Sequence, residues 1–200
     1  MTKERMEMFS DGVIAILITI MVLELKIPHG AGLEALREVL PAFLGYVLSF
    51  VYLGIYWVNH HHMLRMVERI NGKILWANLH LLFWLSLVPA ATAWMDENPL
   101  APLPTAVYGM VLLGPAIAYY ILQTAIIREE GPDCRLAVAI GSDIKGKVSP
   151  LLYVLAIGLS FVQPWLADAI YVLVAAMWLV PDPRLEAHLT AHARHHPSAG

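Results

Sequence analysis

The chain has 200 residues, of which 58% are hydrophobic and only 14% are charged, and its mean hydropathy is +0.63. Soluble proteins average about 25% charged residues, so this composition indicates an integral membrane protein. The net charge of −3 and the lack of a glycine-rich phosphate loop or basic cluster argue against a nucleic-acid partner. Cys134 is the one cysteine, which rules out an intrachain disulfide and a cysteine-based metal knuckle.

The hydropathy pattern divides the chain into apolar runs that alternate with short polar segments. Four uncharged runs are long enough for a spanning helix of about 20 residues, at 39–64, 74–95, 98–127 and 148–167. The opening run and the last one, 169–181, are shorter, and Gln163-Pro164 favours a break between two short helices. We predict an all-α polytopic membrane protein in which residues 1–181 form a single domain of six transmembrane helices.

In chain order, the predicted helices cover residues 4–26, 40–65, 74–95, 105–127, 148–163 and 165–180. An outer loop at 29–38 and an inner connecting loop at 128–147 join them, and Pro115 is expected to kink the fourth helix. Glu24 and Lys26 follow the first apolar segment where a signal peptide would have small residues, so we expect that segment to remain in the mature protein. The His-rich tail, 182–200, is expected to be disordered.

Basic residues are distributed unevenly between the polar segments. If the N-terminus is cytoplasmic, 11 of the 13 Lys and Arg residues lie inside, and Lys26 and Arg37 lie outside. This bias follows the positive-inside rule. It predicts a multi-pass protein of the cell (inner) membrane, surrounded by lipid, with both termini in the cytoplasm.

The first predicted helix has two different faces. Ile16, Ile20 and Leu23 follow one another at steps of four and three and form an apolar stripe that continues to Ile27. Such a stripe is ordinarily a packing surface, but it can also line a pore. Asp11 lies about 140° round the helix from Ile16. A carboxylate in a membrane needs a partner, and the side chains that can donate to it at this depth are Trp57, His60, His61, Asn78 and His80.

Arg5, Phe9, Ser10 and Asp11 form the pattern RxxxFSD, which resembles the signature of the transmembrane protein 175 family of potassium channels. The following VIAILITIMVLELKIP is similar to the family's first helix. SF at 49–50 and YWxxHH at 56–61 are similar to its second, and Asn78 and Pro89 fit its third. The resemblance covers the first three helices, about half of the chain.

This resemblance implies a homotetramer in which the first helix of each subunit lines a central pore, with no filter built from carbonyl groups. Potassium would be the permeant ion, would pass down its gradient, and no cofactor would be needed. Ile16 corresponds to the family's constriction isoleucine, Ile20 and Leu23 follow it as further pore-lining residues, and Thr19 would lie near the permeation path. From its position alone, Glu24 near the outer mouth is interpreted first as a solvated terminal charge, with attraction of cations as the alternative.

The resemblance also implies that the FSD residues hold the first helix against the next two by hydrogen bonds. The predicted helix-anchoring network comprises Arg5, Phe9, Ser10, Asp11, Trp57, His60, His61, Asn78 and His80. Arg5 has an equally good reading as a positive-inside anchor alone.

Two other functions are compatible with the same residues. A membrane enzyme could use Asp11 and the histidines at 60–62 on zinc, but three consecutive helical residues face three directions and do not converge on one ion. A proton-coupled transporter could titrate Asp11 and the second-helix histidines, chiefly His61, because membrane-embedded acids and histidines form relays. The leading hypothesis is a potassium-permeable channel rather than an enzyme.

Overall fold

The computed structural model describes residues 2–25, 27–141 and 143–179, and this described part is helical without strands. The all-α fold class is confirmed. The predicted tail at 182–200 lies outside the described residues. The elements in chain order are α1 (Lys3–Met21), the 3-10 helix η1 (Val22–Glu24), α2 (Leu33–Arg65), α3 (Gly72–Ser86), α4 (Val88–Glu97), α5 (Pro102–Glu130), α6 (Arg135–Ile140), α7 (Ile144–Ser160) and α8 (Pro164–Leu179).

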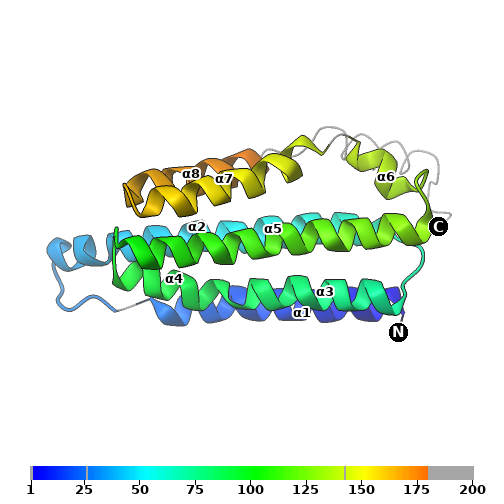
Figure 1. Ribbon diagram of the computed structural model, residues 1–200. Coiled ribbons are helices and arrows are strands. Elements are labelled where there is room, and N and C mark those ends of the chain that lie inside the picture. The colour runs from blue at the N-terminus through cyan, green and yellow to red at the C-terminus, as the bar shows by residue number, and fades with distance from the viewer. Residues whose placement is uncertain (1, 26, 142, 180–200) are drawn as a thin grey trace.

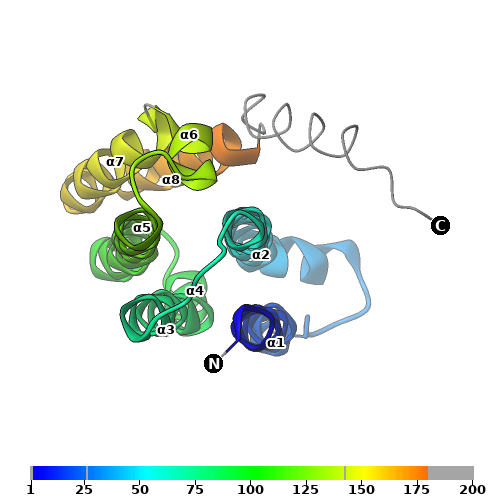
Figure 2. The same ribbon diagram turned by 90° about the vertical axis from the view of Figure 1, so that its right-hand side faces the viewer.

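The long helices run side by side in alternating directions (Figure 1). Viewed end on, α1, α3 and α4 form one layer, α2 and α5 the next, and α7 and α8 a third (Figure 2). α1 lies at the edge of the bundle, packed against α2 and α3. One end of the molecule carries the start of α1, the turn between α2 and α3, the end of α5, and α6. We call it the basic end, because these segments include Lys3, Arg5, Arg65, Arg69, Lys73, Arg128 and Arg135.

Capping residues and proline positions explain where the helices begin and break. The Thr2 side chain accepts from the Arg5 backbone N–H at the start of α1, and Asn71 accepts from Ile74 N–H in the same way at the start of α3. The predicted helix at 74–95 is divided at Leu87, two residues before Pro89, whose ring nitrogen has no hydrogen to donate. Pro115 lies inside α5, which continues through it.

Two segments that were expected to be loops are helical. α2 begins at Leu33 rather than at 40, and Glu34 and Arg37 pair at 2.9 Å on its exposed first turns. Their charges therefore stabilise a solvated helix instead of marking a loop. α6 lies within the predicted inner loop at 128–147, where Leu136 is 1% exposed and anchors the short helix to the bundle.

The described helices differ in whether they can cross a bilayer. The segments Lys3–Glu24, Leu33–Arg65, Gly72–Glu97 and Pro102–Glu130 are long and apolar enough to do so. α7 and α8 have 17 and 16 residues, which is shorter than the usual span of about 20. The chain is therefore a multi-pass membrane protein, and the count of six spans stays a prediction.

A chain of buried hydroxyl groups fixes α2 within the bundle behind α1. Ser49 Oγ accepts a hydrogen bond from Thr92 Oγ1 of α4 at 2.8 Å and lies 2.8 Å from the Tyr108 hydroxyl of α5. All three side chains are buried. Interhelical hydrogen bonds of this kind hold membrane helices together where water offers no alternative partner. α2 is thus a fixed support for α1.

Candidate functional site

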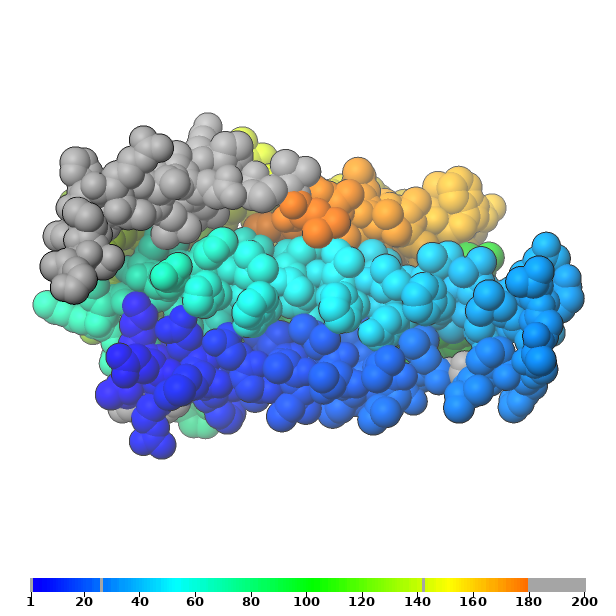
Figure 3. All heavy atoms as spheres, turned by 180° about the vertical axis from the view of Figure 1, so that it is seen from behind, coloured from blue at the N-terminus to red at the C-terminus, as the bar shows by residue number. Residues whose placement is uncertain are grey.

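α1 keeps an apolar stripe on the surface of the subunit. Ile16, Ile20 and Leu23 are 57%, 40% and 79% exposed, and Thr19 between them is exposed as well. Figure 3 shows α1 running along the surface next to α2. The other side of α1 packs into the bundle through Met6, Ser10, Ile14, Leu17 and Met21. The free apolar side that a pore-lining helix needs is therefore present on α1.

Two details refine this stripe. The Thr19 hydroxyl donates to the Ile16 carbonyl at 2.9 Å, which leaves its oxygen able to accept a further hydrogen bond on the exposed side. The stripe was expected to continue to Ile27, but η1 ends at Glu24 and Ile27 lies beyond it. The helical part of the stripe therefore ends at Leu23.

A fully buried chain of hydrogen bonds joins α1, α2 and α3. Asn78 Nδ2 donates to Ser10 Oγ at 2.9 Å, and Ser10 Oγ donates to the Met6 carbonyl at 2.8 Å. His60 Nε2 lies 2.7 Å from Asn78 Oδ1. Because the amide oxygen of Asn78 can only accept, His60 Nε2 is the donor in this contact. Ser10, Asn78 and His60 are at most 2% exposed, so the chain is shielded from water.

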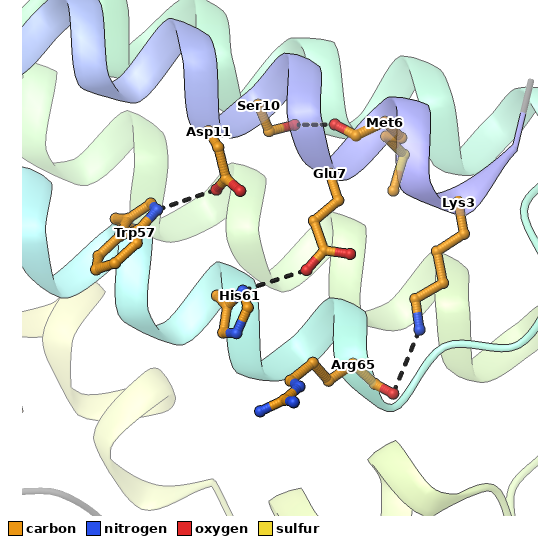
Figure 4. Close-up of polar contacts among 8 residues, drawn as sticks. All are labelled: Lys3, Met6, Glu7, Ser10, Asp11, Trp57, His61 and Arg65. Atoms are coloured by element: carbon orange, nitrogen blue, oxygen red, sulfur yellow. Dashed lines mark hydrogen bonds and ion pairs between the residues drawn. The ribbon is translucent and has the colours of Figure 1, made fainter. Parts of the chain in front are cut away.

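A second set of contacts joins α1 to α2 on a more exposed side, as Figure 4 shows. Trp57 Nε1 donates to Asp11 Oδ1 at 3.0 Å. His61 Nδ1 lies 3.2 Å from Glu7 Oε1, one turn nearer to the basic end. The Trp57 and His61 rings stack with their centroids 6.4 Å apart. Among the predicted donors, Trp57 is therefore the one that pairs with Asp11.

Glu7 was missed by the sequence reasoning, although a usable signal was present. Glu7 precedes Asp11 by four residues and therefore lies on the same face of the helix. His61 follows Trp57 by the same step on α2. Because α1 and α2 are antiparallel, these two equal steps place Asp11 opposite Trp57 and Glu7 opposite His61.

Several predicted site residues are not brought into either set of contacts. Arg5 is exposed, and within the described part of the chain its side chain makes no hydrogen bond or ion pair. Phe9 is 49% exposed. His80 Nε2 accepts from Trp84 Nε1 of its own helix at 2.9 Å. Glu24 is exposed at the end of η1.

The three consecutive histidines of α2 face different surroundings. His60 points to Asn78 and His61 to Glu7, while the His62 ring lies 6.1 Å from that of His61. Within residues 2–25, 27–141 and 143–179, no group of three or more His, Cys, Asp or Glu side chains is arranged to hold a metal ion. The candidate site therefore consists of the apolar stripe on α1 and, on the other sides of the helix, the two sets of polar contacts with α2 and α3.

Comparison with known proteins places these features in a family. The family model described as endosomal/lysosomal potassium channel TMEM175 matches residues 5–89, which include the stripe and both sets of contacts. A protein from Chryseobacterium sp. (strain P1-3), named as a potassium channel, is 54% identical over 189 residues, which are 94% of this chain and 98% of the relative.

Two further comparisons concern a solved structure and a vertebrate protein. The crystal structure of a lysosomal potassium-selective channel TMEM175 homolog from Chamaesiphon minutus superimposes with a TM-score of 0.79 at 30% identity, covering 89% of this chain and 96% of that one. The endosomal/lysosomal proton channel TMEM175 of Gallus gallus is 35% identical over 109 residues, which are 48% of this chain and 22% of that protein. Because the Chryseobacterium relative matches over nearly the whole of both chains, this chain belongs to the TMEM175 family.

Proposed function

We propose that this protein is a potassium channel that conducts passively through a central pore formed by α1 of four identical subunits. The observation that carries the proposal is the two-sided character of α1. Its polar and buried sides are bonded to α2 and α3, while Ile16, Ile20 and Leu23 remain exposed. One helix cannot enclose a pore, so several copies must contribute. The potassium channels among the relatives support the choice of ion and rule against an enzyme.

The stripe predicts how the pore closes. Isoleucine and leucine side chains offer no oxygen ligands to an ion, so a narrow ring of them excludes water and blocks ions by dewetting. The ring conducts when it widens enough to be wetted. Thr19, whose oxygen can still accept, would supply the polar contact beside the ring.

The basic end supports an orientation in the cell membrane. It carries the start of α1, the α2–α3 turn and α6, together with most of the basic residues. Lys and Arg are retained on the cytoplasmic side of membrane proteins. We propose that this end faces the cytoplasm, that both termini are cytoplasmic as an even number of spans requires, and that Glu24 lies at the outer mouth of the pore.

Potassium flux into liposomes tests the proposal. Liposomes containing the wild-type protein should pass potassium, and Ile16→Asn should raise the flux several-fold because a polar ring is wetted more easily. Ile117→Asn is the matched control, since Ile117 is 45% exposed on α5, away from α1, and this variant should behave as wild type. If neither wild type nor Ile16→Asn exceeds empty liposomes, the proposal is wrong.

A proton-conducting or proton-coupled function is the second candidate, because the Gallus gallus relative is named a proton channel. Asp11 and the α2 histidines were the predicted relay. In the structure Asp11 pairs with Trp57, and His61 pairs with Glu7 instead. A pH-sensitive dye in the same liposomes would separate the two candidates. Proton uptake that Asp11→Asn abolishes, without potassium flux, would favour the proton function.

A further inference from the structure

The exposed face of α1 does not stop at Ile16 but continues toward the basic end. Phe9 and Arg5 precede Ile16 by seven and eleven residues, which places each of them within about 20° of it on a helix. Both side chains are exposed, Phe9 by 49%. α1 is a single helix from Lys3 to Met21, so its residues keep this alignment. Gly12, between Phe9 and Ile16, is exposed as well, and a Cβ atom there would meet nothing within 4 Å. The face that we propose to line the pore therefore begins at Arg5.

The other charged side chains of α1 lie away from this face. Lys3, Glu7 and Asp11 point toward α2, and each contacts a group there (Figure 4). Glu4 lies about 120° round the helix from the middle of the stripe. Arg5 is thus the one charged residue of α1 on the exposed stripe, and within the described residues no carboxylate pairs with it.

Four copies of α1 around a pore would bring four guanidinium groups to its cytoplasmic mouth. Rings of Arg or Lys are typical of anion pores, because they attract anions and repel cations. In a potassium channel, such a ring lowers the concentration of potassium at the mouth. Arg5 is about 16 Å from Ile16 along the helix axis. This distance exceeds the Debye length of about 10 Å at 0.1 M salt, so the charge acts on the entry of ions rather than on the constriction.

We propose that Arg5 limits the entry of potassium from the cytoplasm and thereby sets the rectification of the channel, an inference that rests on the proposed function. Potassium that enters from the outside does not have to approach this charge before it reaches the constriction. The channel therefore passes less current outward than inward at equal and opposite voltages. The first residue of the RxxxFSD pattern acts on permeation, whereas Ser10 and Asp11 of the same pattern attach the helix.

Current recordings from excised patches in symmetric potassium test this role. At about 0.1 M salt, Arg5→Gln should raise the ratio of outward to inward current several-fold, whereas Arg5→Lys, which keeps the charge, should rectify as the wild type does. At about 1 M salt the Debye length falls to about 3 Å, so the wild type and Arg5→Gln should have the same ratio. Arg128→Gln is the matched control, because Arg128 is exposed in the last turn of α5, in another layer of the bundle, and its loss should leave the ratio unchanged.

Chemical modification changes the charge at position 5 after the channel has assembled, so that an effect on folding is separated from an effect on permeation. In a Cys134→Ser background, Arg5→Cys is treated from the cytoplasmic side with methanethiosulfonate reagents. The reagent that carries a positive charge should lower the outward current, and the one that carries a negative charge should raise it. Arg128→Cys in the same background should respond to neither reagent.

Three results would overturn the inference: a wild-type current that does not rectify at 0.1 M salt, rectification that survives in Arg5→Gln, or reagents of opposite charge that act alike on Arg5→Cys. Each would leave Arg5 as a positive-inside anchor alone. A wild type that passes no potassium defeats the proposed function itself. A conducting wild type whose current ratio ignores the charge at position 5 defeats only this inference.

Discussion

Ser10, His60 and Asn78, from three different helices, are joined by hydrogen bonds at the junction of α1, α2 and α3, while the buried Nδ1 of His60 has no partner among the described residues. Asn78 uses both ends of its amide, accepting from His60 at 2.7 Å and donating to Ser10 at 2.9 Å. A shorter or apolar side chain at position 78 would leave the buried His60 Nε2 without a partner and remove the donor to Ser10 Oγ, which would keep only its bond to the Met6 carbonyl. Ser10, His60 and Asn78 of the predicted network thus form this dry chain, whereas Asp11 and Trp57 form a separate, more exposed contact.

At this scale, Asn78→Ala is expected to lower the free energy of unfolding by about 1–3 kcal/mol, the cost of leaving a buried polar group without a partner. The measurement is unfolding of the purified protein by a denaturing detergent. Asn98→Ala is the matched control, because Asn98 is exposed at the C-cap of α4 and its side chain donates to the Trp94 carbonyl of that helix. Equal destabilisation by both substitutions would contradict the role given to the buried chain.

Among the elements, α5 is the central helix of the bundle that packs behind α1. It packs on α3 on one side and on α7 on the other. Gly114 permits the close approach to α3, since a Cβ atom there would overlap the ring of Trp84. That ring has little freedom to move, because its Nε1 donates to His80 at 2.9 Å. His80 therefore serves the packing of α3 against α5 rather than the anchoring of α1.

Gly114→Ala is accordingly expected to destabilise the protein by about 1–3 kcal/mol through overpacking. Gly158→Ala in α7 is the opposite case, because a Cβ atom there meets nothing within 4 Å. That substitution should be neutral or stabilising by up to about 1 kcal/mol, the difference in helix propensity. Detergent unfolding of the two variants side by side measures both effects, and equal loss of stability would refute the close-packing account.

For the molecule as a whole, we expect the exposed stripe of α1 to face the same stripe of neighbouring subunits. We expect the purified protein to have four times the 22.2 kDa subunit mass. In a Cys134→Ser background, Ile20→Cys should form disulfide-linked dimers under mild oxidation, because side chains around a narrow pore approach within bonding distance. Ile117→Cys, exposed on α5, should remain monomeric on a denaturing gel. Efficient cross-linking through position 117 with none through position 20 would refute the α1 pore.

Much of the element order could be read from the sequence, because hydropathy alone reports which segments leave water. α8 begins at Pro164, one residue before its predicted start, whereas α5 begins at Pro102, three residues before the predicted start at 105; in both helices a proline occupies the first helical position. The extension of α2 to Leu33 could not be read in this way. Its charged first turns look like loop in composition, yet they are helical in the structure, and the exposed Glu34–Arg37 pair there adds only about 0.2–0.5 kcal/mol.

The sequence by itself determined that this is a multi-pass helical membrane protein, that its first helix has an aliphatic and an acidic face, and that Asp11 needs a partner. Only the tertiary structure decided which donor that partner is. Trp57, His60 and His61 lie within five residues on α2, yet each contacts a different partner. The rotation of α2 about its axis relative to α1 and α3 determines that Trp57 pairs with Asp11, His61 with Glu7 and His60 with Asn78. Composition and spacing along one chain do not contain that rotation, because it is set by packing between helices.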